Sequence, residues 1–161
     1  MRRARVAARL ILPAVWLGMI IGISLIEAPL KFMAPGITIP LGLGIGRLVF
    51  TAMNIVELVI AALLVLCCVR AGVDRRFWGL LWATVAVLLV KVAVIRPILN
   101  HETDRVLAGL SAGGSAIHLF YIAADGVLIV LLVLLLAAGA RRWLAVPPTP
   151  HRVDGRGAAG C

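Results

Sequence analysis

Two acidic residues and one lysine stand inside long apolar stretches of this chain: Glu57, Asp125 and Lys91. Each lies about ten residues from the end of its stretch, roughly 15 Å at 1.5 Å per helical residue and close to the middle of a 30 Å hydrocarbon core. A charge at that depth costs about 2.5–3.5 kcal/mol, so we expect Lys91 to pair with at least one of the acids. A paired carboxylate in a membrane is suited to hold a proton or a cation.

Other polar side chains accompany these acids at helical spacing. At 100° per residue, Arg47 and Asn54 fall on the same side of a helix as Glu57, and His118 falls on the same side as Asp125. We therefore predict one intramembrane polar site. Its residues are Glu57, Asp125, Lys91, Asn54, His118 and Tyr121.

A second polar group is predicted nearer the outer surface. This outer vestibule comprises Glu27, Lys31, Arg47, Arg96 and Asn100. Glu27 and Lys31 are four residues apart and are expected to pair on one helix. A purely structural interpretation remains open for both groups, because buried ions also fix helix register and arginines extend to lipid headgroups.

No residue set predicts a metal site, a nucleophile or a bound cofactor, although haem, flavin and copper stay open. His118 has no second membrane histidine with which to ligate haem, since His101 and His151 fall in a loop and a tail. Cys67 and Cys68 are adjacent, which fits apolar packing better than a thiolate pair for copper.

Composition identifies the class of protein. The 161 residues are 63% hydrophobic and 14% charged, with a mean hydropathy of +1.10, whereas soluble domains contain about 25% charged residues. The net charge of +9 comes from residues at helix ends and tails. Membrane topology explains this charge better than nucleic-acid binding does.

The polar residues must be positioned by four predicted transmembrane helices, which form an all-α bundle. The helices are expected at about 10–30, 44–68, 77–100 and 115–140, after a basic flank at 1–9 and before a disordered tail at 141–161. Pro29 and a loop from Lys31 to Gly36 should end the first helix. A loop from His101 to Arg105 and a short helix from Val106 to Gly114 should precede the fourth.

The basic residues also predict orientation. The N-terminal flank, the turn at 70–76 and the tail contain eleven of the sixteen lysines and arginines. The positive-inside rule then places both termini in the cytoplasm, in a multi-pass protein of a bacterial inner membrane.

A shift of 68 residues superimposes three features of the two chain halves: Pro29 on Pro97, Gly46 on Gly114, and Glu57 on Asp125. The pattern is compatible with two duplicated helical hairpins of parallel topology, an arrangement that transport proteins use.

The segments Glu27–Phe32 and Gly42–Phe50, together with Pro97 and the helix of His118, resemble small four-helix membrane proteins related to the copper-resistance D family. The similarity covers most of residues 15–135. It implies a four-helix bundle and the handling of a metal or small solute. This chain lacks the several membrane histidines and the methionine cluster of the copper proteins.

The polar site favours a permease or channel-like protein that handles a proton, a cation or a small solute. A membrane-bound redox or quinone-linked enzyme using His118, Tyr121 and Asp125 is one alternative, and an accessory subunit of a larger membrane complex is another. The expected partners are the lipid bilayer and either further copies of the chain or another membrane protein, with no nucleic acid.

Overall fold

The computed structural model describes residues 2–69, 72–110 and 116–143, and it is all-helical there. Four helices in these ranges are long and apolar enough to cross a membrane, as predicted. We call them the first to fourth spans. They are Ala4–Met33, Ile39–Cys68, Arg75–Leu107 and His118–Arg142.

The first span does not end at Pro29. It consists of α1 (Arg2–Ile20), a π-helical segment η1 (Ile21–Glu27), the short α2 (Ala28–Leu30) and a 3-10 turn η2 (Lys31–Met33). A proline ring clashes with the carbonyl four residues before it. For Pro29 that carbonyl belongs to Leu25 in η1, and the wide π turn lets the helix continue. The predicted loop from Lys31 to Gly36 is therefore wrong for its first three residues.

The second span is α3 (Ile39–Cys68), which ends where predicted and begins five residues earlier. Thr38 caps its start by accepting a hydrogen bond from the Leu41 N–H at 3.4 Å. At its other end, Arg9 of α1 donates two hydrogen bonds to the Cys67 carbonyl, at 2.7 and 3.1 Å. A cation at this position also complements the negative end of the helix dipole.

The third span has the same construction as the first. It consists of α4 (Arg75–Val90), a π-helical segment η3 (Lys91–Ile95) and α5 (Arg96–Leu107). The predicted loop at 101–105 is helical, stabilised by an ion pair of Arg105 with Glu102 at 3.5 Å. The predicted helix at 106–114 is wrong in its described part, because Val106 and Leu107 belong to α5 and a turn at 108–110 contains Gly109 with φ 71°. Residues 111–114 lie outside the described ranges.

The fourth span is α6 (Ala116–Trp143). The tail was predicted to be disordered from residue 141, but it is helical up to Trp143. In this last turn, Arg142 pairs with Asp74 at 2.9 Å. The remainder, 144–161, lies outside the described residues.

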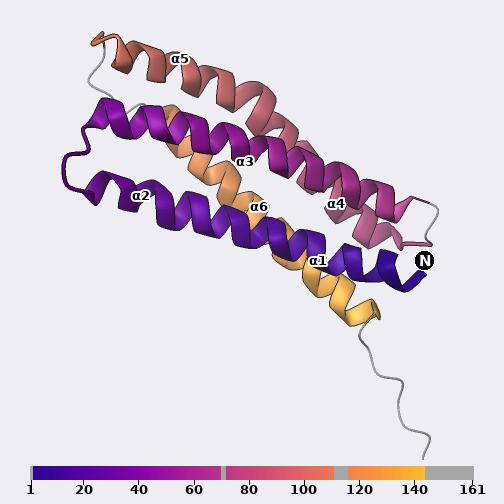
Figure 1. The fold of residues 1–161 in the computed structure, drawn as a ribbon. Helices are drawn as coiled ribbons and strands as arrows, with labels where there is room; N and C mark the ends of the chain where they lie inside the picture. Colours follow the sequence, from indigo (N-terminus) through magenta and orange to yellow (C-terminus); the bar gives the residue numbers. More distant parts are fainter. Residues whose placement is uncertain (1, 70–71, 111–115, 144–161) are drawn as a thin grey trace, which may run out of the picture.

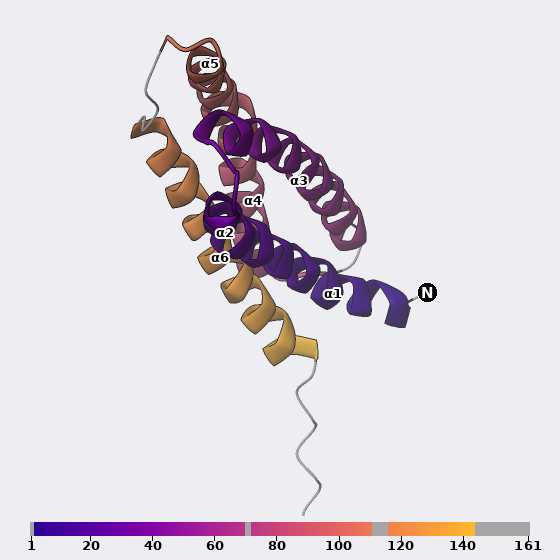
Figure 2. The ribbon, with the colours of Figure 1, turned by 60° about the vertical axis from the view of Figure 1, so that its left-hand side comes forward.

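The spans run alternately up and down (Figure 1). The start of α1 and the end of α6 lie at one end, and the end of α5 and the start of α3 lie at the other, which we call the pocket end. Figure 2 shows α3 and α6 on opposite sides of the first and third spans. All four spans contribute to a buried apolar cluster made of Trp16, Ile20, Ile60, Ala61, Leu88, Leu128 and Leu132.

Candidate functional site

Lys91 is the centre of a buried ionic cluster. Its ammonium lies 2.6 Å from Glu57 Oε2 and donates hydrogen bonds to Glu57 Oε1 at 2.9 Å and to Asp125 Oδ1 at 2.7 Å. The lysine side chain is 0% exposed, and its nitrogen also lies 5.2 Å from the centre of the Tyr121 ring. The structure confirms the predicted pairing and extends it, because one lysine binds both acids.

Two further donors complete this cluster, and the sequence analysis missed both. Trp16 Nε1 donates to Glu57 Oε1 at 3.0 Å, and Ser24 Oγ donates to Asp125 Oδ2 at 2.6 Å. Both donors belong to the first span, whose tryptophan and serine carry no charge that would mark them. Each acid thus binds the shared lysine and one neutral donor.

The π segments position the cluster. Ser24 lies in η1 and Lys91 begins η3, whereas the two acids lie on regular helices. The Arg96 N–H donates to the Lys91 carbonyl, five residues back, which is the π hydrogen-bond pattern. In an α-helix, positions five apart point about 140° away from each other. The π turn instead brings Lys91 and Arg96 toward one side of the third span.

Asn54 and Tyr121 form a second polar contact beside the cluster. Tyr121 Oη donates to Asn54 Oδ1 at 3.0 Å, and both residues are buried. Asn54 Nδ2 is buried without a hydrogen-bond partner among the described residues. The Tyr121 ring meets Phe50 edge to face, with 5.3 Å between centroids. The guanidinium carbon of Arg96 lies 5.9 Å from the centre of the Phe50 ring.

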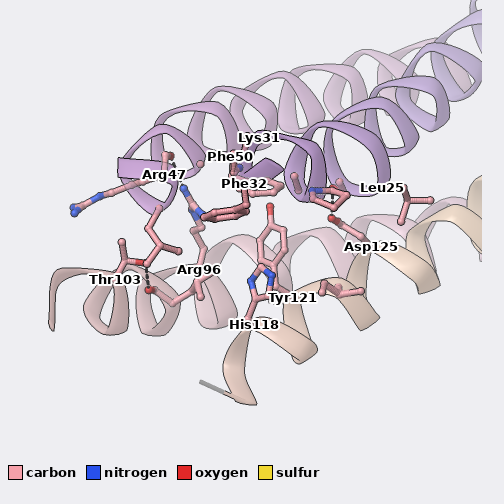
Figure 3. Close-up of a pocket in the computed structure, with 18 residues that line it drawn as sticks. Leu25, Lys31, Phe32, Arg47, Phe50, Arg96, Thr103, His118, Tyr121 and Asp125 are labelled. Carbon is pink, nitrogen blue, oxygen red and sulfur yellow. Dashed lines mark hydrogen bonds between the residues drawn. The ribbon is translucent and has the colours of Figure 1, made fainter. Parts of the chain in front are cut away.

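A pocket of about 400 Å³ lies at the pocket end, beside the cluster (Figure 3). Asp125 is the one acid of the cluster that lines it, and its side chain is only 2% exposed. Its walls combine apolar, aromatic and basic side chains: Leu25, Leu43, Leu99, Ile122, Phe32, Phe50, Tyr121, Lys31, Arg47, Arg96 and His118.

The structure places most of the predicted vestibule here. Lys31, Arg47 and Arg96 line the pocket. Glu27 pairs with Lys31 at 3.4 Å, as predicted. Neither Glu27 nor Asn100 is among the lining residues. Within the predicted intramembrane site, His118 lines the pocket as an exposed residue and lies apart from the buried cluster.

Two glycines of α3 give the pocket its shape. A Cβ on Gly42 would lie 2.3 Å from the Phe32 ring, and a Cβ on Gly46 would lie 2.8 Å from Lys31 Nζ. Small residues four apart let other groups approach a helix closely. Here they allow Phe32 and Lys31 to lie against α3 and to form part of the wall.

The described ranges contain no group of three or more His, Cys, Asp or Glu side chains placed to hold a metal ion. Cys68 is buried in an apolar cluster with Leu64, Phe77, Leu81 and Leu135, which supports the interpretation of this cysteine as core packing. Comparison of the chain with known protein families, with characterised proteins and with solved structures finds no match.

Proposed function

We propose that this chain is a multi-pass membrane protein whose buried cluster binds and releases a proton, or a small cation in its place, during permease- or channel-like passage. The observation that carries the proposal is the shared lysine. Glu57 and Asp125 bring two negative charges against the single positive charge of Lys91, all in a buried site.

A buried excess charge of this kind favours proton uptake. Like charges in a low-dielectric site oppose each other's ionisation, so a proton on either acid removes the excess. Asp125 is placed to take up this proton, because it lines the pocket and also contacts Lys91. Lys91 in turn links Asp125 to Glu57, the acid deeper in the protein.

The distribution of basic residues supports an orientation with both termini in the cytoplasm, which turns the pocket end outward. Lys91 stands midway along the third span, a depth that suits passage from one side to the other. Four helices enclose little space, so we expect the protein to act as a homo-oligomer or with another membrane protein, in a bacterial inner membrane.

The π segments favour the duplication of a helical hairpin. The Ala28 N–H donates to the Ile23 carbonyl, and the Arg96 N–H donates to the Lys91 carbonyl. The same shift of 68 residues relates these two bonds, the prolines that follow them, and the two acids. Parallel hairpin repeats with the polar site at their interface are known from transporters.

Reconstituted vesicles test the proposal. Flux of protons, Na⁺ or K⁺ under an imposed membrane potential is measured for the wild type, for Glu57→Gln and for the triple variant Glu57→Gln, Lys91→Met, Asp125→Asn. We expect at least a tenfold loss of flux in both variants, since the amide retains the shape of the acid and cannot release a proton.

Asp74→Asn is the matched control, because Asp74 is an acid far from the cluster that pairs with Arg142 near the other end of the bundle. It should keep wild-type flux. A folded triple variant that conducts like the wild type would overturn the proposal, as would wild-type vesicles that conduct no better than empty ones.

A further inference from the structure

Arg96 differs from Lys31 and Arg47, the other lysine and arginine side chains of the pocket, in having no acidic partner among the residues that the structure describes. Lys31 pairs with Glu27, and Arg47 pairs with Asp104. Arg96 is only 7% exposed, and among the described residues its guanidinium forms no ion pair.

The hydrogen bonds of Arg96 leave part of its guanidinium available to a ligand. Its Nη2 donates to the Arg47 carbonyl at 2.6 Å and to Thr51 Oγ1 at 2.9 Å, both neutral oxygens. The structure gives Nε and Nη1 no hydrogen-bond partner among the described residues, and the side chain lies along the pocket wall (Figure 3). Because Nη2 already donates two hydrogen bonds, a carboxylate in the pocket can accept a single charge-assisted hydrogen bond from Nη1 or from Nε.

The rest of the pocket suits an apolar body attached to that carboxylate. Phe50 lies near two cations, with its centroid 5.1 Å from Lys31 Nζ and 5.9 Å from the guanidinium carbon of Arg96. Leu99 and Ile122 add aliphatic surface. The volume of about 400 Å³ falls in the range of small-molecule sites, about 300–1,000 Å³.

The charge of Arg96 and the net charge of the ionic cluster are opposite in sign. Arg96 contributes one uncompensated positive charge, and the three side chains of the cluster contribute one uncompensated negative charge. Arg96 and Asp125 line the same pocket. A monoanion at Arg96 and a proton on the cluster neutralise both charges together, so each should favour the binding of the other. A dianion would leave a charge over, because Lys31 and Arg47 already have partners.

We infer that the pocket binds a monocarboxylate with an apolar body, that Arg96 holds its carboxylate, and that one proton enters with it onto the pair of acids. This inference rests on the proposed function and assigns its substrate class. A weak acid thus binds as separated parts, with its anion on Arg96 and its proton on Glu57 or Asp125. The acid arrives either from water or from the bilayer as a fatty acid.

Calorimetry on the purified protein in phosphatidylcholine nanodiscs tests this inference. Benzoate is titrated in two buffers that differ in ionisation enthalpy, which gives both the affinity and the number of protons taken up. We expect uptake near one proton per benzoate. Benzamide and benzylammonium, which match its shape and differ in charge, should bind at least tenfold more weakly. This comparison needs no variant, so it stands even if a substitution prevents folding.

Variants then distinguish carboxylate binding by Arg96 from proton uptake by the acids. Arg96→Gln should weaken the binding of benzoate at least tenfold, and Arg96→Lys should weaken it less, since lysine keeps the positive charge. Arg105→Gln is the control, because this half-exposed arginine pairs with Glu102 outside the pocket. Glu57→Gln should still bind benzoate while proton uptake falls toward zero, because the cluster is then already neutral.

A second arm replaces benzoate with dodecanoate, which partitions into the bilayer. Binding of either acid that depends on Arg96 supports the inference, and the acid that binds more tightly identifies the source. Equal binding by the wild type and Arg96→Gln overturns it, as does equal binding of benzoate and benzamide. Absence of binding beside a proton flux that depends on Glu57 overturns this inference alone. Benzoate binding without proton uptake, beside flux that Glu57→Gln leaves unchanged, overturns the proposed function as well.

Discussion

Replacing Lys91 with methionine probes the cluster most directly. Methionine retains an unbranched chain of similar length, so the substitution removes the charge and the hydrogen-bond donors with little change in packing. The ammonium contacts Glu57 and Asp125 at 2.6 and 2.7 Å, and the lysine side chain is 0% exposed. After the change, Trp16 and Ser24 are the remaining donors that the structure shows for these two carboxylates.

The expected loss of stability is large. Removing one partner of a buried ion pair costs about 3–5 kcal/mol, because a buried charge remains uncompensated. One lysine serves two acids here, so we expect the upper part of that range. Replacement of a whole buried ionic group by neutral side chains is often neutral or stabilising. Adding Glu57→Gln and Asp125→Asn to Lys91→Met should therefore restore the free energy of unfolding to at least the wild-type value.

Reversible unfolding in mixed micelles of a mild detergent and dodecyl sulfate, followed by circular dichroism, measures these differences. Arg142→Met is the matched control, since it breaks a pair with Asp74 whose side chains are each 42% exposed and should cost less than about 1 kcal/mol. The reasoning is refuted if Lys91→Met unfolds within about 1 kcal/mol of the wild type, or if the triple variant is no more stable than the single one.

The same unfolding assay checks two further changes. Gly42→Ala places a Cβ 2.3 Å from the Phe32 ring and should lower the free energy of unfolding by about 1–3 kcal/mol, whereas Gly44→Ala meets nothing within 4 Å and should raise it by up to about 1 kcal/mol. Equal effects would contradict this account. Trp16→Phe removes the N–H that binds Glu57 at 3.0 Å and should cost about 1–3 kcal/mol. That cost should shrink when Glu57→Gln is already present, and an unchanged cost would show that the indole acts through packing alone.

The spans and the central ion pair were predictable from the sequence because apolar length and isolated charges are strong local signals. The structure confirms four candidate spans and the contact of Lys91 with both acids. Helix ends were less predictable. The glycines of α3 and the charged residues at 101–105 are typical of loops, yet contacts made after folding extend both helices, including an ion pair between Arg47 and Asp104.

The neutral donors and the pairing of the arginines were not predictable at all. Nothing in the local pattern distinguishes Ser24 from an ordinary small residue in an apolar helix. Calculating helix faces at 100° per residue also separates Lys91 from Arg96, because it assumes an unbroken α-helix. Only the π turns, which follow from the path of the whole span past Pro29 and Pro97, bring these side chains to the site.

These π turns also have a mechanical consequence. A continuous α-helix behaves as one stiff rod, whereas a helix bends most readily where its hydrogen-bond ladder changes pitch. The first and third spans each change pitch just before their proline. On the N-terminal side of the π segment in the first span and in the third span, α1 and α4 pack into the apolar clusters. On the side of the pocket end, η2 and α5 contribute to the pocket wall. The two spans can therefore bend at the level of the ionic cluster. The pocket end can then adjust its shape to a bound ligand while the packing of α1 and α4 stays unchanged.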